Sequence, residues 1–150
     1  MTSKGIQPTT RVISFAEVEA SEEVAEALSL EKEDKVYSLV RLRFGDNNPV
    51  VIVTTYLPKK YLPDLMEYDF DEVSLYSVLE ELGYGVRSIS RTLEITFANE
   101  LTSELLNINM DDPLFYFKSI GRTTEKIPVE YSIARYRSDL NTFRFEVELE

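Results

Sequence analysis

The chain has 150 residues, 43% of them hydrophobic, a formal net charge of −11, and neither cysteine nor histidine. This length suits one domain with a sizeable core, and the acidic balance argues against a broad basic surface for nucleic acid. Without cysteine there can be no disulfide or thiolate chemistry, which is compatible with a reducing cytoplasm. No stretch resembles a signal peptide or a bilayer-spanning run of about 20 apolar residues. We therefore expect a cytoplasmic domain with no membrane partner.

The chain is expected to begin with a lead-in, a strand and a short helix. Residues 1–10 are polar and predict a flexible lead-in or linker, so the domain is taken to span 11–150. The stretch "RVISFAEVEA", which starts at Arg11, alternates in the way that is typical of a strand. In "SEEVAEALSL", Ser21 stands in an N-cap position before two acids and an apolar face, which predicts a helix over 21–28.

A hairpin is predicted over 36–58, "VYSLVRLRFGDNNPVVIVTTYLP", with its polar turn at 45–49. The first half alternates with period two, so Arg41 and Arg43 point the same way, one pleat apart. The strand face that carries the two arginines begins with the apolar side chains of Tyr37 and Leu39. An acidic protein thus places two permanent cations side by side on a face that starts as core.

The rest of the chain is predicted to form a helix, a strand, a helix and three strands, over 74–82, 86–98, 99–108, 112–123, 127–137 and 142–150. Turns this short join antiparallel neighbours, since parallel strands need long crossovers. Helices interrupt the strands without alternating regularly with them. The predicted fold class is α+β, a largely antiparallel sheet of about six strands with helices packed on it.

The final predicted strand, "TFRFEVELE", raises a question of assembly. Its apolar positions alternate, which creates a face that must be covered by the core or by a partner: Phe143, Phe145, Val147 and Leu149. Because symmetric pairs are the commonest assemblies, we expect a homodimer.

No residue pattern in the chain points to catalysis. Without histidine the chain lacks the usual general base near neutral pH and the commonest transition-metal ligand, so a Ser-His-Asp triad and an HExxH zinc site are impossible. No GxGxxG or GxxxxGK[ST] phosphate loop and no D-x-D-x-D-G calcium loop is present. We expect no catalytic residue, no metal and no cofactor, and hence no enzyme.

A small set of polar residues has two readings each. Arg41 and Arg43 form either a bidentate clamp for phosphate or carboxylate, or cross-strand ion pairs with acidic side chains. Ser74, at the expected start of a helix, is either a simple cap or part of an anion site. Glu130 shares a strand face with Tyr136, and it either faces solvent or accepts hydrogen bonds from the hydroxyls of a ligand.

Three stretches together, "VRLRFGDNNPVVIVTTYLP", "SLYSVLEELGY" and "DPLFYFKSI…IPVEYSIARYRSDLNTFRFEV", resemble the UTRA domain. This is the effector-binding module of the HutC subfamily of GntR bacterial transcription regulators. The likeness runs from about Arg11 to the C-terminus. Each motif is weak alone, whereas their order and spacing are specific. The resemblance implies a chorismate-lyase-like fold, usually dimeric, that senses a small metabolite. It also implies that DNA is bound by an N-terminal winged helix-turn-helix domain. The residues before Arg11 do not contain such a domain, so we expect DNA to be bound only through a domain outside this chain.

The resemblance also implies a ligand site. Arg41 and Arg43 match arginines that grip the phosphate of sugar-phosphate effectors. Ser74 and Tyr76 belong to the Ser-Leu-Tyr helix start, where the serine lies beside that phosphate. In the matching strand, Glu130 and Tyr136 meet the rest of the ligand. The implied partner is a small anionic metabolite such as a phosphorylated sugar.

One position departs from the pattern of the family. Sugar-phosphate-sensing members have a glutamate on the second hairpin strand, where this chain has Val53. The change removes an acceptor for sugar hydroxyls or an amine, which weakens the case for the usual amino-sugar phosphate but leaves the anion clamp. Three classes of function follow: a ligand sensor in a transcription regulator, a chorismate-lyase-like enzyme, and a dimerisation module with a degenerate pocket. We expect the first.

Overall fold

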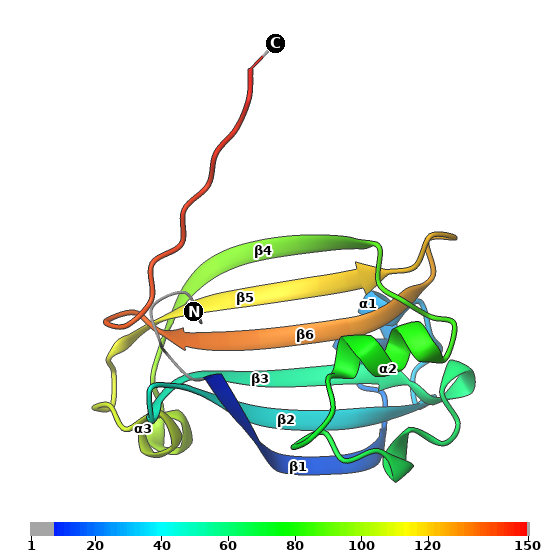
Figure 1. Ribbon diagram of the computed structural model, residues 1–150, viewed down its shortest axis with the longest axis horizontal. Helices are drawn as coiled ribbons and strands as arrows, with labels where there is room; N and C mark the ends of the chain where they lie inside the picture. Colours follow the sequence, from blue (N-terminus) through cyan, green and yellow to red (C-terminus); the bar gives the residue numbers. More distant parts are fainter. Residues whose placement is uncertain (1–7, 150) are drawn as a thin grey trace.

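A computed structural model describes residues 8–149 and shows one six-stranded sheet with three α-helices (Figure 1). In chain order the elements are β1 (Pro8–Glu19), α1 (Glu22–Leu28), β2 (Lys35–Gly45), β3 (Asn48–Pro58), the 3₁₀ turns η2 (Lys59–Tyr61) and η3 (Leu65–Glu67), α2 (Leu75–Glu81), β4 (Ser88–Phe97), α3 (Glu100–Leu106), β5 (Pro113–Arg122) and β6 (Pro128–Arg137). The spatial order is β1-β2-β3-β6-β5-β4, and every neighbouring pair is antiparallel. The predicted α+β class is confirmed.

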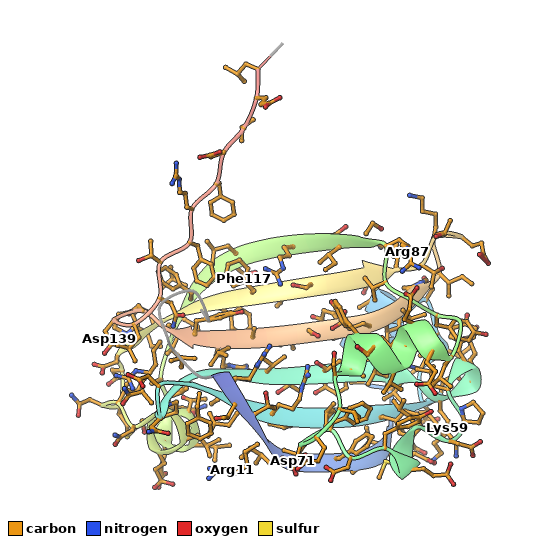
Figure 2. All side chains as sticks on the ribbon, viewed as in Figure 1. Arg11, Lys59, Asp71, Arg87, Phe117 and Asp139 are labelled. Carbon is orange, nitrogen blue, oxygen red and sulfur yellow. The ribbon has the colours of Figure 1, made fainter. Side chains whose placement is uncertain are left out.

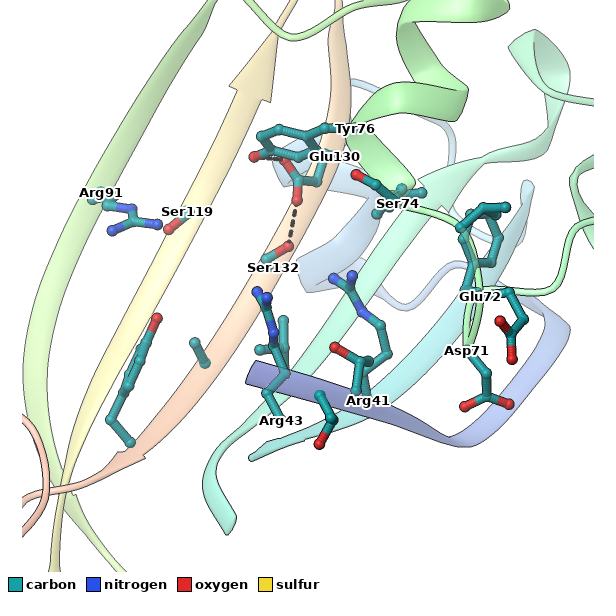
Figure 3. A pocket seen from close by; sticks show the side chains of 18 residues that line it. Arg41, Arg43, Asp71, Glu72, Ser74, Tyr76, Arg91, Ser119, Glu130 and Ser132 are labelled. Carbon is teal, nitrogen blue, oxygen red and sulfur yellow. Dashed lines mark hydrogen bonds between the residues drawn. The ribbon is translucent and has the colours of Figure 1, made fainter. Parts of the chain in front are cut away.

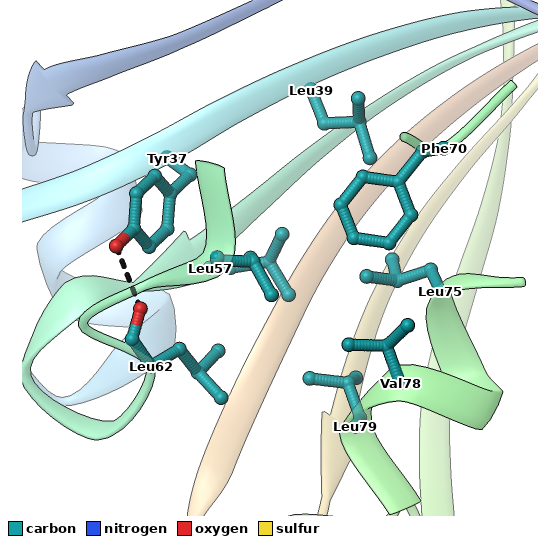
Figure 4. Packing of buried hydrophobic residues seen from close by; sticks show 9 residues of the cluster. Tyr37, Leu39, Leu57, Leu62, Phe70, Leu75, Val78 and Leu79 are labelled. Carbon is teal, nitrogen blue, oxygen red and sulfur yellow. Dashed lines mark hydrogen bonds between the residues drawn. The ribbon is translucent and has the colours of Figure 1, made fainter. Parts of the chain in front are cut away.

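Helices cover both faces of the sheet. On one face, α1 packs against β2 and β6, and α3 packs over the ends of β2, β3 and β5. On the other face, α2 lies across the strands in front of the sheet in Figure 1. Beneath α2, Leu39 and Leu57 from the hairpin meet Leu75 and Leu79 from the helix in a buried cluster (Figure 4). The buried Tyr37 hydroxyl donates to the Leu62 carbonyl at 2.6 Å and ties the loop before α2 to this cluster.

The helices begin where their side-chain chemistry predicts. The Ser21 hydroxyl accepts from the Val24 backbone N–H at the start of α1. Asn99 forms a reciprocal capping box with Thr102 at the start of α3. These local contacts satisfy backbone donors that the first turn of a helix leaves unpaired.

The hairpin turn is tighter than the sequence analysis expects. Strand β2 continues to Gly45 and β3 begins at Asn48, so only Asp46 and Asn47 connect them, with φ of 53° and 67°. Two consecutive left-handed residues match the twist of the hairpin strands, and asparagine and aspartate tolerate that conformation. Consequently Pro49 lies inside β3, and a register shift between Arg43 and Phe44 absorbs the difference.

The predicted strand over 142–150 is wrong within the residues described. The chain has no regular secondary structure from 141 to 149, and residue 150 lies outside the described part. A strand needs a neighbour for its backbone hydrogen bonds, and β6 already has β3 and β5 on its two sides. At the other end, β1 begins at Pro8, inside the predicted lead-in, of which residues 1–7 lie outside the described part.

Candidate functional site

A cavity of about 730 Å³ opens on the face of the sheet that carries α2 (Figure 3). Its floor comes from β2, β3, β6, β5 and β4, and its wall from the loop and first turn of α2. The structure brings all six sequence-predicted residues to this one cavity: Arg41, Arg43, Ser74, Tyr76, Glu130 and Tyr136. Such a volume suits a small ligand.

Strand register explains how residues far apart in the chain meet here. Arg41 pairs with Val53 on β3, and Val53 pairs with Ala134 on β6. One pleat further, Arg43 pairs with Val51, and Val51 pairs with Tyr136. Since side chains of directly opposed residues point to the same face, the two arginines, Val53 and Tyr136 share the cavity floor.

The two arginines point the same way, toward Ser132 and the start of α2 (Figure 3). Within residues 8–149 neither forms an ion pair, so the reading as cross-strand pairs does not hold there. Arg41 donates through Nη2 to the Thr55 hydroxyl at 3.3 Å, whereas its buried Nε has no hydrogen-bond partner in this part of the chain. Burial and the neighbouring charge of Arg43 lower the pKa of Arg41. Arg41 is therefore a desolvated cation with an unmatched donor.

Glu130 is a buried carboxylate, 5% exposed, and two hydroxyls hold it. Tyr76 donates to Oε1 at 2.7 Å, and Ser132 donates to Oε2 at 2.8 Å. Because the Ser132 proton is used in this way, Thr55 must donate to Ser132 across their 2.9 Å contact. A one-directional chain of hydrogen bonds thus runs from Arg41 through Thr55 and Ser132 to Glu130.

This chain of hydrogen bonds separates the cavity into two ends. Arg41 and Arg43 present positive charge and free donors at one end, near Ser74. At the other end, Glu130 presents a carboxylate and Tyr76 a hydroxyl. Charge-assisted and bidentate bonds suit the first end to an anion, and the second end can exchange hydrogen bonds with hydroxyl groups. The carboxylate does not face bulk solvent, in contrast to the solvent-facing reading from sequence, and its charge acts on Arg41.

Ser74 acts as the N-cap of α2, because its hydroxyl accepts from the Ser77 backbone N–H at 3.4 Å. Of the two roles considered for Ser74 from the sequence, the structure shows that of a helix cap. It also lines the cavity. Nearby, Asp71 accepts from the Val12 backbone N–H at 2.7 Å, next to a register shift in β1. This contact fastens the loop before α2 to the edge of the sheet and fixes that wall of the cavity.

Sequence analysis missed several residues that line or support the site, among them Ser132, Arg91, Ser119 and Gly121. Arg91 on the edge strand β4 is opposite Ser119 on β5, and both line the cavity from the side away from Arg41 (Figure 3). Gly121 is opposite Glu130, and a Cβ there would stand 2.7 Å from Oε1 of that carboxylate. The pairing of β4, β5 and β6 brings Arg91 and Ser119 to the cavity and Gly121 against Glu130, and sequence alternation does not report which strands pair.

The part of the chain that the structure describes contains no group of three or more acidic, histidine or cysteine side chains placed to hold a metal ion. Over the same residues, no helix combines the length and the apolar composition needed to cross a membrane.

An α+β domain with a polar cavity between its sheet and a short helix is the architecture of a small-molecule-binding module. A family model described as the UTRA domain matches residues 3–141. The chain belongs to the UTRA domain family. The resemblance stated from the sequence is confirmed.

Relatives and solved structures agree with this assignment. The chain is 30% identical over 131 residues to the HTH-type transcriptional regulator GmuR of Bacillus subtilis, covering 87% of this chain and 55% of GmuR. It superposes on the effector domain of PhnF from Mycobacterium smegmatis with a TM-score of 0.92, at 22% identity over 98% of this chain and 91% of that one. A GntR-family regulator from Bacillus cereus gives a TM-score of 0.83, at 24% identity, 94% coverage of this chain and 99% of the other. At these identities the two structures show a shared fold. The names are those of regulators, in agreement with the expectation that the chain is not an enzyme.

Proposed function

We propose that this chain is the effector-binding and dimerisation domain of a HutC-type transcription regulator. The effector is a small anionic metabolite such as a phosphorylated sugar, and its binding modulates operator binding by a winged helix-turn-helix domain outside this chain. The chain spans about half of the length of GmuR, which leaves room for a DNA-binding domain in the whole protein. The site of action is the cytoplasm, where operator DNA lies.

The observation that carries the proposal is the state of Arg41. Its guanidinium is largely desolvated and lies beside a second cation, and its buried Nε has no hydrogen-bond partner among residues 8–149. A buried polar group without a partner costs free energy, about 1–3 kcal/mol by typical measurements. An anion between Arg41 and Arg43 would offset the repulsion between the two guanidinium groups. Arginine suits this task because its planar fork binds two oxygens at once.

Val53 strengthens the argument for an anion. It is opposite Arg41 in the strand pairing and lines the cavity, so a glutamate at this position would stand beside the guanidinium. Valine supplies no charge. Glu130 offsets part of the positive charge of Arg41, and with valine at position 53 an anionic ligand can supply further negative charge beside the guanidinium. This same feature argues against reading Val53 as a mark of a degenerate pocket.

The experiment is a thermal shift measurement with inorganic phosphate, glucose 6-phosphate and a panel of other phosphorylated sugars. A ligand present at about a hundred times its dissociation constant should add roughly 2.7 kcal/mol to the free energy of unfolding. In Arg43→Ala this gain should disappear while the ligand-free domain stays folded. Arg43→Lys should recover part of it, since a point charge makes no bidentate contact.

Arg135→Ala is the matched control. Arg135 lies on β6 over the Tyr116 ring, on the opposite face of the sheet, so this variant loses the same charge away from the cavity. It should keep the ligand-induced shift. If Arg43→Ala leaves the shift intact, or if no phosphorylated compound shifts the unfolding temperature, the proposed anion site is wrong.

A further inference from the structure

The chain leaves the body of the domain after Phe143 and runs outward as an extended tail (Figure 1). Its three apolar residues are largely exposed: Phe145 by 71%, Val147 by 79% and Leu149 by 90%. Figure 2 shows the side chains of the tail standing apart from the body of the domain. Alternation of this kind is typical of a strand with one buried face. Within residues 8–149 of one chain, however, no surface covers the apolar side of the tail.

The root of the tail is fixed. The Phe143 ring meets the rings of Phe117, Tyr136 and Phe115 edge to face, with centroids 4.8, 4.9 and 5.2 Å apart. Just before it, the Asn141 amide donates to the Arg137 carbonyl at 2.7 Å. These contacts aim the tail away from its own sheet. The exposed apolar residues therefore follow a well-anchored segment.

The edge strand β4 has the complementary property. It pairs with β5 on one side only, so the backbone groups of its other side have no strand partner in the described chain. Its apolar side chains are exposed, among them Leu93 by 41%, Ile95 by 57% and Phe97 by 61%. A long apolar edge strand is a template for pairing with another chain, and natural proteins normally cover or blunt it.

We propose that residues 144–149 of each copy pair with β4 of a second copy, in a reciprocal exchange about a two-fold axis. This inference rests on the dimer in the proposed function and assigns its contact. Six extended residues reach about 20 Å, and the ten residues of β4 reach about 33 Å, so the tail fits along the strand. A two-fold axis makes the contact self-complementary, because each copy supplies one tail and one edge.

The side-chain pattern of the two segments agrees with this pairing. On β4, Leu93 and Ile95 share a face with Arg91, whereas Thr92 and Glu94 point the other way. On the tail, Val147 and its apolar neighbours alternate with charged residues. A tail strand beside β4 would thus continue both the apolar and the polar face of the sheet, and the backbone bonds would close the open edge.

The exchange would also place the partner next to the cavity. Arg91 on β4 lines the cavity and stacks on the Phe117 ring, with 5.4 Å between the guanidinium carbon and the ring centroid. Phe117 in turn contacts Phe143 at the root of the tail. Arg91 on the edge strand and Phe143 at the root of the tail therefore contact the same ring, that of Phe117, which packs against the cavity residue Tyr136.

The test uses single cysteines, because the natural chain has none. Leu93→Cys is mixed in turn with Phe145→Cys, Val147→Cys and Leu149→Cys under oxidising conditions, and disulfide-linked dimers are counted. At least one mixture should give a linked dimer in high yield, since a link between the two variants must join different copies. The control replaces Leu93→Cys by Glu104→Cys, on the exposed side of α3. Yields no higher than this control would overturn the proposal.

Sedimentation of the full chain separates this inference from the function it rests on. Val147→Asp should raise the dimer dissociation constant by about tenfold or more, since two apolar side chains are lost from each dimer. Glu148→Gln, on the opposite side of the tail, should not. If Val147→Asp dimerises unchanged, the tail exchange is wrong and the dimer stands. If the wild-type chain is a monomer at tens of micromolar, about the range of weak interfaces, both fail. The phosphate-induced thermal shift tests the ligand site separately in either case.

Discussion

Tyr76 donates a hydrogen bond to Oε1 of Glu130 at 2.7 Å, although 54 residues separate them in the chain. The contact joins the first turn of α2 to β6 and closes the cavity between them. Burial, together with the charge of Glu130, raises the pKa of Tyr76 well above its usual range. The hydroxyl therefore stays a donor across the neutral range. This hydrogen bond couples the position of the helix to that of the carboxylate.

Tyr76→Phe should lower the free energy of unfolding by about 1 kcal/mol, because Glu130 loses one of its two hydroxyl donors. Glu130→Gln should also destabilise the domain, since the amide nitrogen is no acceptor. The two changes should be less than additive in the double variant, as expected for groups in direct contact. Urea unfolding of the four proteins measures this coupling, and additive effects would contradict a stabilising contact.

The local parts of this fold were predictable from the sequence. Period-two alternation placed Arg41 and Arg43 on one face because side-chain direction in a strand depends on position alone. Ser21 and Asn99 marked helix starts because a cap is made within one turn. Both kinds of inference need no knowledge of which segments lie side by side. The candidate site as a set came from the resemblance to the UTRA domain, which implied that residues from separate segments share one ligand.

The remaining features depend on strand pairing. Arg91 reaches the cavity because β4 pairs with β5, and Gly121 matters because it is opposite Glu130. Neither pairing is encoded in the spacing of residues along the chain. The tail was wrongly predicted as a strand for the same reason. Alternation around Val147 indicates that one side of the segment is apolar, but it does not indicate which part of the protein covers that side. Each of these errors concerns which segments, distant in sequence, lie side by side in the fold.

Val53→Glu tests how the cavity balances its charge. The new carboxylate would lie beside Arg41, its partner in the strand pairing, and would pair with the guanidinium. We expect the apparent affinity for inorganic phosphate, measured by thermal shift, to fall by about tenfold or more, because the internal anion competes with the ligand. Val53→Gln, of equal size but neutral, is the control and should retain more of the binding. Equal loss in both variants would indicate a steric cause and contradict the electrostatic one.

Gly121→Ala should destabilise the domain by about 1–3 kcal/mol through overpacking. The added Cβ would stand 2.7 Å from Oε1 of Glu130 and 3.1 Å from the Val86 side chain, so the buried carboxylate must move away from Tyr76. In a chain that already carries Glu130→Ala, the same change should cost much less, because the obstructing carboxylate is gone. Thermal unfolding of the four proteins gives the comparison. An undiminished cost would assign the strain to the backbone or to Val86.

Alkaline pH should weaken the fold through its buried tyrosines, and Tyr131 is the clearest case. Its hydroxyl donates to Oε2 of Glu23 at 2.6 Å and links β6 to α1. Burial, followed by this hydrogen bond and the charge of Glu23, raises the pKa of Tyr131 well above its usual range. In the unfolded chain the same group titrates near 10. Above that pH the unfolded state releases a proton that the folded state keeps.

The unfolded state then binds fewer protons than the folded state, so the free energy of unfolding must fall as the pH rises above about 10. Tyr131→Phe removes one such proton. The variant should be less stable at pH 7, because Glu23 loses a donor, but its stability should decline less steeply between about pH 9.5 and 11. Burial also raises the pKa of Tyr37, so a slope should remain in the variant. Urea unfolding at a series of pH values measures both slopes. Equal slopes would mean that Tyr131 releases its proton at the same pH in the folded and unfolded chains, which a hydroxyl buried against a carboxylate should not do.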